Sequence, residues 1–355
     1  MCSLSNPLYD IHQSYLENAE KGPFFSYEIP ERIVIPEHGW MDFLNTRVAT
    51  PIGIPAGPLL NSRWISLASD LGYDLLWYKT IRSHEYAGHA LPNVIYVDVN
   101  ENHASVRDSI PSDLEHLAIT NSFGMPSRSP EYLAKDIPLA QKALKPGQAL
   151  IVSVVGTPDL KERSFTEDFV YTALLAKECG ATLIEANYSC PNLGCKSGSL
   201  YLDPEAVFQL TKKLAEALMD TPLIIKMGTF PNEEVLSSVL EAAARGGARA
   251  VAGINSVGMQ VTDKFNKPAL GEDRVSSGIC GSPIRPAALD FTRKARQIIH
   301  KNHLDLTLIG GGGITLPDHF DDFFEAGADI AVTATGMMWD PYLAYRYHLN
   351  QLVAY

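Results

Sequence analysis

The chain has 355 residues, of which 46% are hydrophobic and 20% are charged, and its formal net charge is −12. This length suits one large α/β domain as well as two smaller ones. The acidic balance disfavours nucleic acid as a partner, because phosphate binding needs a cluster of lysine and arginine that the sequence lacks.

Residues 1–48 show no strong hydrophobic period. We expect an N-terminal extension that packs on the main domain as a structural wrap, with partner binding or gating as the alternative. The first twenty residues are polar and acidic, unlike a signal or transit peptide. No run approaches the ~18 apolar residues of a membrane span. The sequence therefore predicts a cytoplasmic protein with no membrane partner.

From residue 52 onward, short apolar runs alternate with amphipathic segments, which is typical of strands followed by helices. Eight alternations predict a closed parallel (β/α)8 TIM barrel that forms a single domain over residues 49–355. A doubly wound open sheet is the alternative architecture. The expected strands span 52–56, 74–79, 150–154, 182–187, 222–226, 249–254, 306–309 and 329–333.

Helix start signals support this reading. Asp203 and Pro204 combine an N-cap with a first-turn proline, and Pro231 and Asn232 open the next helix. Further helices are expected after residue 318 and over 293–299 and 342–353.

Two connections, 80–149 and 256–286, are too long for ordinary loops. Insertions of this kind in a barrel usually cover the mouth of the active site. We therefore expect both to contribute to a site at the carboxyl ends of the strands.

Unusual polar residues fall at these predicted strand ends, where barrel enzymes place their chemistry. In the stretch 185–192, Cys190 lies between Asn187 and Asn192 and is a candidate base; an inert buried thiol is the alternative. Lys79 and Lys226 also end apolar runs. A lysine with a purely structural role is the alternative for Lys226.

Small residues follow the last two predicted strands, at 310–313 and 334–336. Barrels often bind a phosphate there through backbone N–H groups, although a tight turn is the alternative. Asn121, within the first insertion, lies in another turn-like segment and is either a ligand-binding carboxamide or part of a plain turn.

The five cysteines form no CxxC pair, and their odd number fits a reducing compartment. We therefore predict no metal or iron–sulfur site. The cysteines other than Cys190 are interpreted as incidental; they are Cys2, Cys179, Cys195 and Cys280.

Several motifs, in this order along residues 50–345, resemble dihydroorotate dehydrogenase. They are Asn121-Ser-Phe-Gly-Met-Pro, Asn187-x-Ser-Cys-Pro-Asn, the strand-end lysines Lys79 and Lys226, the turn at Asn255-Ser256 and the late glycine loop. Cysteine at position 190 is similar to class 1, the soluble branch of that family.

The resemblance implies that FMN lies across the barrel mouth and that the substrate stacks on its ring. Cys190 would remove a proton from dihydroorotate, Lys79 would contact both cofactor and substrate, and Lys226 would face the edge of the flavin that becomes negative on reduction. The implied substrate-binding residues are Lys79, Asn121, Phe123, Gly124, Met125, Asn187, Asn192, Asn255 and Ser256. The implied cofactor-binding residues are Ala56, Gly57, Lys79, Thr80, Asn121, Ser153, Asn187, Lys226, Asn255, Gly278, Gly281, Gly311, Gly312, Ala334 and Thr335.

The resemblance also implies oxidation of dihydroorotate to orotate in pyrimidine biosynthesis by a homodimer that uses fumarate. NAD is the alternative electron acceptor, and its use would need a separate subunit that carries a flavin and an iron–sulfur cluster. Two other enzymes remain alternatives: a dihydropyrimidine dehydrogenase-like reductase, which usually carries histidine at the position of Asn192, and a tRNA dihydrouridine synthase-like enzyme. A catalytically silent barrel that binds a phosphorylated ligand is a third.

Overall fold

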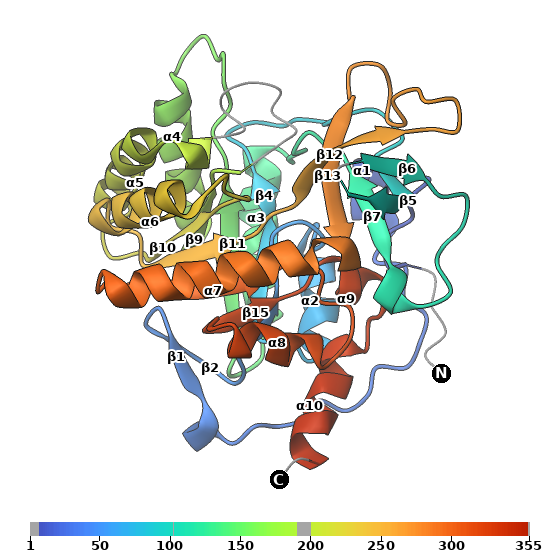
Figure 1. The fold of residues 1–355 in the computed structure, drawn as a ribbon. Helices are drawn as coiled ribbons and strands as arrows, with labels where there is room; N and C mark the ends of the chain where they lie inside the picture. Colours follow the sequence, from blue (N-terminus) through green and yellow to red (C-terminus); the bar gives the residue numbers. More distant parts are fainter. Residues whose placement is uncertain (1–6, 102, 190–199, 354–355) are drawn as a thin grey trace.

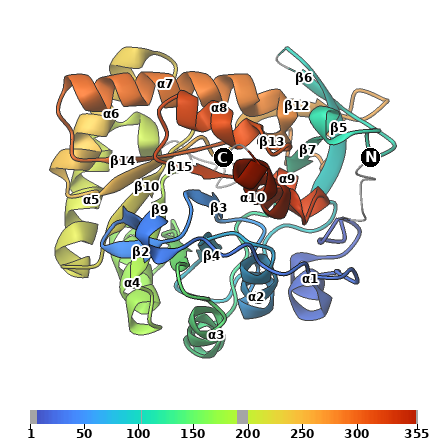
Figure 2. The same cartoon turned by 90° about the horizontal axis from the view of Figure 1, so that it is seen from below.

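The computed structural model describes residues 7–101, 103–189 and 200–353. Within these ranges, eight parallel strands close into a barrel, in the order in which they follow one another along the chain (Figures 1 and 2). They are β3 (Ile52–Ile54), β4 (Leu75–Ile81), β8 (Ala149–Val154), β9 (Leu183–Asn187), β10 (Leu223–Lys226), β11 (Ala250–Gly253), β14 (Thr307–Gly311) and β15 (Ile330–Val332). The predicted barrel is confirmed, and the open sheet is wrong because β15 pairs with β3.

Helices connect the barrel strands and pack around the outside. They are α2 (Ser62–Asp70), α3 (Pro130–Lys142), α4 (Phe165–Glu178), α5 (Pro204–Leu218), α6 (Glu233–Arg245), α7 (Arg285–Lys301) and α8 (His319–Glu325), and α9 (Thr335–Trp339) and α10 (Leu343–Val353) follow β15. Asp203 and Asn232 cap α5 and α6 as predicted. Helix α7 begins earlier than expected because Pro286 occupies its first turn.

A hairpin from the N-terminal extension closes the amino end of the barrel. Its strands are β1 (Met41–Phe43) and β2 (Thr46–Val48), and Leu44 and Asn45 form the turn with φ angles of 47° and 68°. Two positive φ values match the tight turn that suits the twist of paired strands. Phe43, Leu44 and Val48 pack against inward-facing residues of the barrel strands. Figure 2 views the barrel from the side of this hairpin.

The two long insertions build a second sheet together (Figure 1, upper right). The first contributes β5 (Val94–Asn100), β6 (His103–Val106) and β7 (Ala118–Asn121), and the second contributes β12 (Val257–Thr262) and β13 (Ser276–Gly281). Strand β13 pairs with β7, and β12 pairs with β6, so these strands close into a small barrel of their own. Short 3₁₀ turns lie at Leu114–His116 and Ser282–Ile284.

The rest of the extension wraps around the molecule. It contains α1 (Tyr15–Lys21) and a 3₁₀ turn at Glu37–Gly39. Arg32 forms an ion pair with the buried carboxylate of Asp74, and Tyr342 donates a hydrogen bond to the Glu28 carbonyl at 2.6 Å. None of the described helices is long and apolar enough to pass through a bilayer.

Replacing Phe43 with alanine should lower the free energy of unfolding by about 3–5 kcal/mol, because the ring is 1% exposed and fills the amino end of the barrel. Equilibrium unfolding in urea measures this change. The control is Val34→Ala in the same extension, at a side chain that is 81% exposed, and it should change stability by less than about 0.5 kcal/mol. Equal stability of both variants would show that the hairpin does not seal the barrel.

Candidate active site

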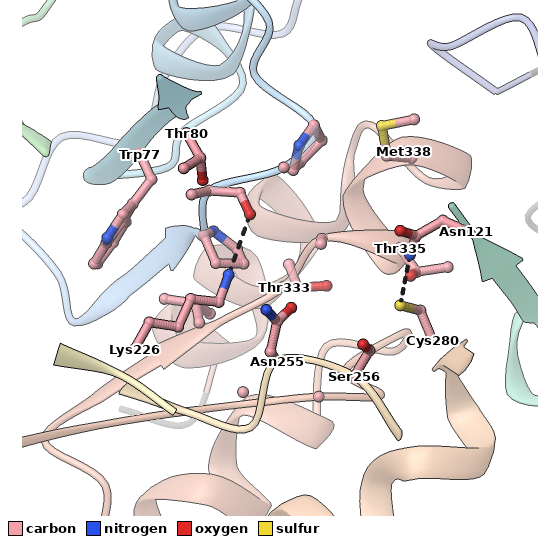
Figure 3. Close-up of a pocket in the computed structure, with 18 of the residues that line it drawn as sticks. Trp77, Thr80, Asn121, Lys226, Asn255, Ser256, Cys280, Thr333, Thr335 and Met338 are labelled. Atoms are coloured by element: carbon pink, nitrogen blue, oxygen red, sulfur yellow. Dashed lines mark hydrogen bonds between the residues drawn. The ribbon is translucent and has the colours of Figure 1, made fainter. Parts of the chain in front are cut away.

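A pocket lies at the carboxyl ends of the barrel strands (Figure 3). Parallel strands bring their carboxyl ends to one rim, so residues far apart in sequence meet there. The small second sheet and the N-terminal extension also contribute to its wall.

The structure gathers most of the predicted site residues in this pocket. Those that line it are Ala56, Gly57, Lys79, Thr80, Asn121, Phe123, Met125, Asn187, Lys226, Asn255, Ser256, Gly281, Gly311, Gly312, Ala334 and Thr335. Among the described residues, Gly124, Ser153 and Gly278 do not line it. Cys190 and Asn192 lie outside the described residues.

Lys226 ends β10, and its ammonium is buried in the pocket. The side chain is held by a hydrogen bond of 3.2 Å from Nζ to the carbonyl of Ala56, which follows β3 (Figure 3). Burial raises the pKa of the neighbouring Glu185 carboxyl, although the positive charge of Lys226 acts in the opposite direction. The structure thus fixes a cation and a titratable carboxyl in the same pocket wall.

Ser153 is a buried residue that contacts two residues of the pocket wall. Its hydroxyl donates to the Glu185 carboxylate at 2.9 Å and lies 3.0 Å from the hydroxyl oxygen of Thr80. Both Glu185 and Thr80 line the pocket, whereas Ser153 is fully buried. Ser153, predicted as a cofactor contact, is therefore connected to the pocket through these two side chains.

Three carboxamides converge on the pocket, each with its nitrogen bound to a protein acceptor. Asn121 Nδ2 donates to Cys280 Sγ at 3.1 Å, and Asn187 Nδ2 donates to Met125 Sδ at 3.6 Å. Asn255 donates to the carbonyl of Ser189. Because these bonds orient the amide planes, the remaining amide donors and acceptors are presented in fixed directions.

Cys280, to which the sequence pattern assigns no role, lies in the pocket wall on β13 (Figure 3). Sequence reasoning left this residue without a role, whereas the structure places it beside Asn121 in the pocket. Burial raises the pKa of its thiol to about 11, although Lys226 and Asn121 lower it. The thiol is neutral at pH 7 and accepts the Asn121 bond as a weak acceptor. The signal that could have identified this position is its neighbour Gly281, which the sequence already marks as a candidate.

Sequence reasoning also missed aromatic residues of the pocket wall. Tyr9 and Tyr15 come from the N-terminal extension, and Trp77 and Trp339 come from β4 and α9. The Tyr9 ring meets the ring of Phe123 edge to face, with centroids 5.6 Å apart. No local pattern marks Tyr9 and Tyr15, because only packing of the extension brings them to the barrel mouth.

Gly311, Gly312 and Gly313 form a close-fitting backbone surface at the end of β14. A Cβ on Gly311 would lie 2.7 Å from the Val332 carbonyl oxygen, and a Cβ on Gly313 would lie 2.8 Å from the Arg285 nitrogen. Gly312 and Gly313 have φ angles of 132° and 80°. Backbone that is free of side chains allows close approach by a phosphate.

Carboxamides and lysines that meet at the carboxyl end of a closed barrel define an enzyme of the (β/α)8 class. The family model described as "Dihydroorotate dehydrogenase" matches residues 41–349. The chain therefore belongs to the dihydroorotate dehydrogenase family, a family of flavin-dependent oxidoreductases.

Individual relatives agree with this assignment. The chain is 46% identical to dihydroorotate dehydrogenase of Dictyostelium discoideum, with 98% of each chain covered. It is 29% identical to dihydroorotate dehydrogenase A (fumarate) of Limosilactobacillus reuteri (strain DSM 20016), over 55% of this chain and 59% of that one. It is 28% identical to the catalytic subunit of dihydroorotate dehydrogenase B (NAD(+)) of Enterococcus faecalis (strain ATCC 700802 / V583), over 63% and 66%.

Replacing Cys280 with valine should lower the free energy of unfolding by about 1 kcal/mol, because the Asn121 amide loses its acceptor. Cys280→Ser is the matched control, since a hydroxyl oxygen also accepts, and it should remain closer to wild type. Urea unfolding of the three proteins measures the difference. A valine variant as stable as wild type would contradict a stabilising Asn121–Cys280 bond.

Proposed function

We propose that this chain binds FMN in the pocket and oxidises (S)-dihydroorotate to orotate, a step of pyrimidine biosynthesis. The observation that carries the proposal is the convergence of Asn121, Asn187 and Asn255 around the buried Lys226. Carboxamides match the amide groups of a cyclic imide, because each offers both a donor and an acceptor. The whole-length similarity to the Dictyostelium discoideum enzyme supports the same substrate.

The pocket residues fit FMN. The glycine backbone at 311–313 and the adjoining Ala334 and Thr335 suit a phosphate group, and the apolar and aromatic walls suit a planar ring. Bound FMN supplies the hydride acceptor. Lys226 provides a fixed positive charge that stabilises negative charge developing beside it.

We assign the remaining contacts by position in the pocket. The proposed substrate contacts are Lys79, Asn121, Phe123, Met125, Asn187, Asn255 and Ser256, with Asn192 from outside the described residues. The proposed cofactor contacts are Ala56, Gly57, Lys79, Thr80, Asn121, Asn187, Lys226, Asn255, Gly281, Gly311, Gly312, Ala334 and Thr335.

Gly124 and Gly278 do not line the pocket, and in this proposal they influence binding through neighbouring residues that do. Gly124 lies between the lining residues Phe123 and Met125, and Gly278 pairs with Asn121 across β13 and β7. Ser153 acts through Thr80 and Glu185.

The proposed base is Cys190, which removes a proton from the carbon next to the one that loses hydride. A thiol has an ordinary pKa of about 8.5, close enough to neutral pH to serve as a base once its surroundings lower it. The proposed electron acceptor is fumarate, as in the name of the Limosilactobacillus reuteri relative. We further propose a cytoplasmic homodimer, in line with the resemblance to class 1 enzymes.

Anaerobic addition of dihydroorotate to the purified, FMN-loaded protein should bleach the flavin absorbance at about 450 nm. Fumarate should then restore the colour, because it reoxidises the cofactor. A spectrophotometer records both half-reactions. Bleaching that fumarate does not reverse would reject fumarate alone, and an FMN-loaded protein that does not bleach would reject the substrate.

Cys190→Ala should retain FMN but lose turnover by about 100-fold or more, because no base removes the proton. Cys195→Ala, within the same stretch of sequence, is the matched control and should keep normal turnover. Steady-state assays and FMN content measure the two effects. Normal turnover of the Cys190 variant would reject the base assignment.

A further inference from the structure

Arg82 is a buried cation directly after β4, the strand that carries Lys79. Arg82 is 3% exposed to solvent. Nε donates to the carbonyl of Met125 at 2.8 Å, and one Nη donates to the carbonyl of Gly124 at 3.0 Å. The other Nη donates to the hydroxyl of Thr157 at 2.9 Å. The planar fork therefore bridges two successive carbonyls of one turn.

The bridged turn has an uncommon backbone conformation. Gly124 has a φ of 71° and Met125 has a φ of 58°. A residue with a Cβ disfavours this left-handed region, so other contacts must hold Met125 in it. A Cβ on Gly124 would also lie 2.6 Å from the ring of His89, so this position leaves no room for a side chain.

The turn shapes the wall of the pocket. Phe123 and Met125 both line the pocket, and Met125 Sδ accepts the hydrogen bond from Asn187 Nδ2. Asn121 precedes the turn and also lines the pocket. A shift of the two carbonyls bound by Arg82 would therefore move three groups that face the ligand.

We propose that Arg82 is a positioning residue for the pyrimidine site: its guanidinium fork holds the Gly124–Met125 turn in the geometry that binds the substrate. This role rests on the proposed function of the pocket. Arg82 does not line the pocket, so it acts through Met125 and Gly124. Both donors of the fork are needed, because a single ammonium cannot bridge two carbonyls in the same geometry.

The test uses the FMN-loaded full chain with Arg82→Gln and Arg82→Lys. Both should weaken orotate binding, measured by equilibrium dialysis, and lower kcat/KM for dihydroorotate by between about tenfold and 100-fold, because the binding wall is displaced. FMN content should match wild type. The Arg82 guanidinium also lies over the ring of Tyr86, with Cζ 4.6 Å from the ring centroid. Arg245→Gln is therefore the control, because the Arg245 guanidinium lies in the same way over the ring of Phe208 on α5, at 4.8 Å, and this variant should behave as wild type.

If Arg82→Lys bound orotate as tightly as wild type, the proposal would be overturned, because a positive charge without the guanidinium geometry would then be enough to hold the turn. Wild-type protein that neither binds orotate nor turns over would instead reject the proposed function, so the two failures are distinguishable. If the Arg82 variants do not fold, Thr157→Val decides, since it removes one anchor of the guanidinium. Weaker orotate binding would then support the proposal, and wild-type affinity would reject it.

A double-mutant cycle gives a readout that a general loss of stability does not move. Glycine adopts positive φ without strain, so Met125→Gly relieves the conformation that Arg82 holds. Arg82→Gln should therefore weaken orotate binding less in the Met125→Gly background than in wild type. In an Asn255→Ala background the effect of Arg82→Gln should be undiminished. Equal losses in all three backgrounds would reject the coupling between Arg82 and the turn.

Discussion

Closure of the barrel is the constraint on which the rest of the structure depends. The last strand meets the first through Ala331 opposite Ile52 and Val332 opposite Gly53. A Cβ on Gly53 would lie 2.4 Å from the Leu75 carbonyl oxygen, so β3 can approach β4 this closely only without a side chain there. Once the ring is closed, the carboxyl ends of all its strands lie on one rim. Side chains separated by up to hundreds of residues then share one pocket.

The pocket brings together polar side chains that are largely buried, and a buried polar group is costly unless it has a hydrogen-bond partner. Lys226 reaches across to the carbonyl of Ala56, and Glu185 is bound by Ser153. The asparagines are oriented by sulfur and backbone acceptors. Fixed groups of this kind stabilise charge without rearranging, which is the main contribution that an active site of this type makes.

The wall opposite the barrel is assembled from three separate parts of the chain. Pairing of β13 with β7 joins the two insertions and brings Cys280 to Asn121. The extension adds Tyr9, whose ring packs on Phe123. Arg82, directly after β4, donates hydrogen bonds to the carbonyls of Gly124 and Met125 and so connects the turn after Phe123 to the barrel. The pyrimidine side of the pocket therefore depends on contacts between elements that are remote in sequence.

The sequence by itself determined the barrel, its strand order and the residues at the strand ends. Strand and helix periods are local, and caps such as Asp203 and Asn232 lie next to the helices they start. Carboxyl-end residues such as Asn187 and Lys226 could be assigned to a common site because parallel strands end at one rim.

Only the tertiary structure decided which residues complete the pocket. Strand β12 has a single buried position, and it pairs with β6 across a long stretch of chain, so no local pattern reveals this pairing. Tyr9, Cys280 and Arg82 acquire their roles from neighbours that are distant in sequence. The physical reason is that periodicity encodes which face of an element is buried, whereas the identity of its partner depends on packing of the whole chain.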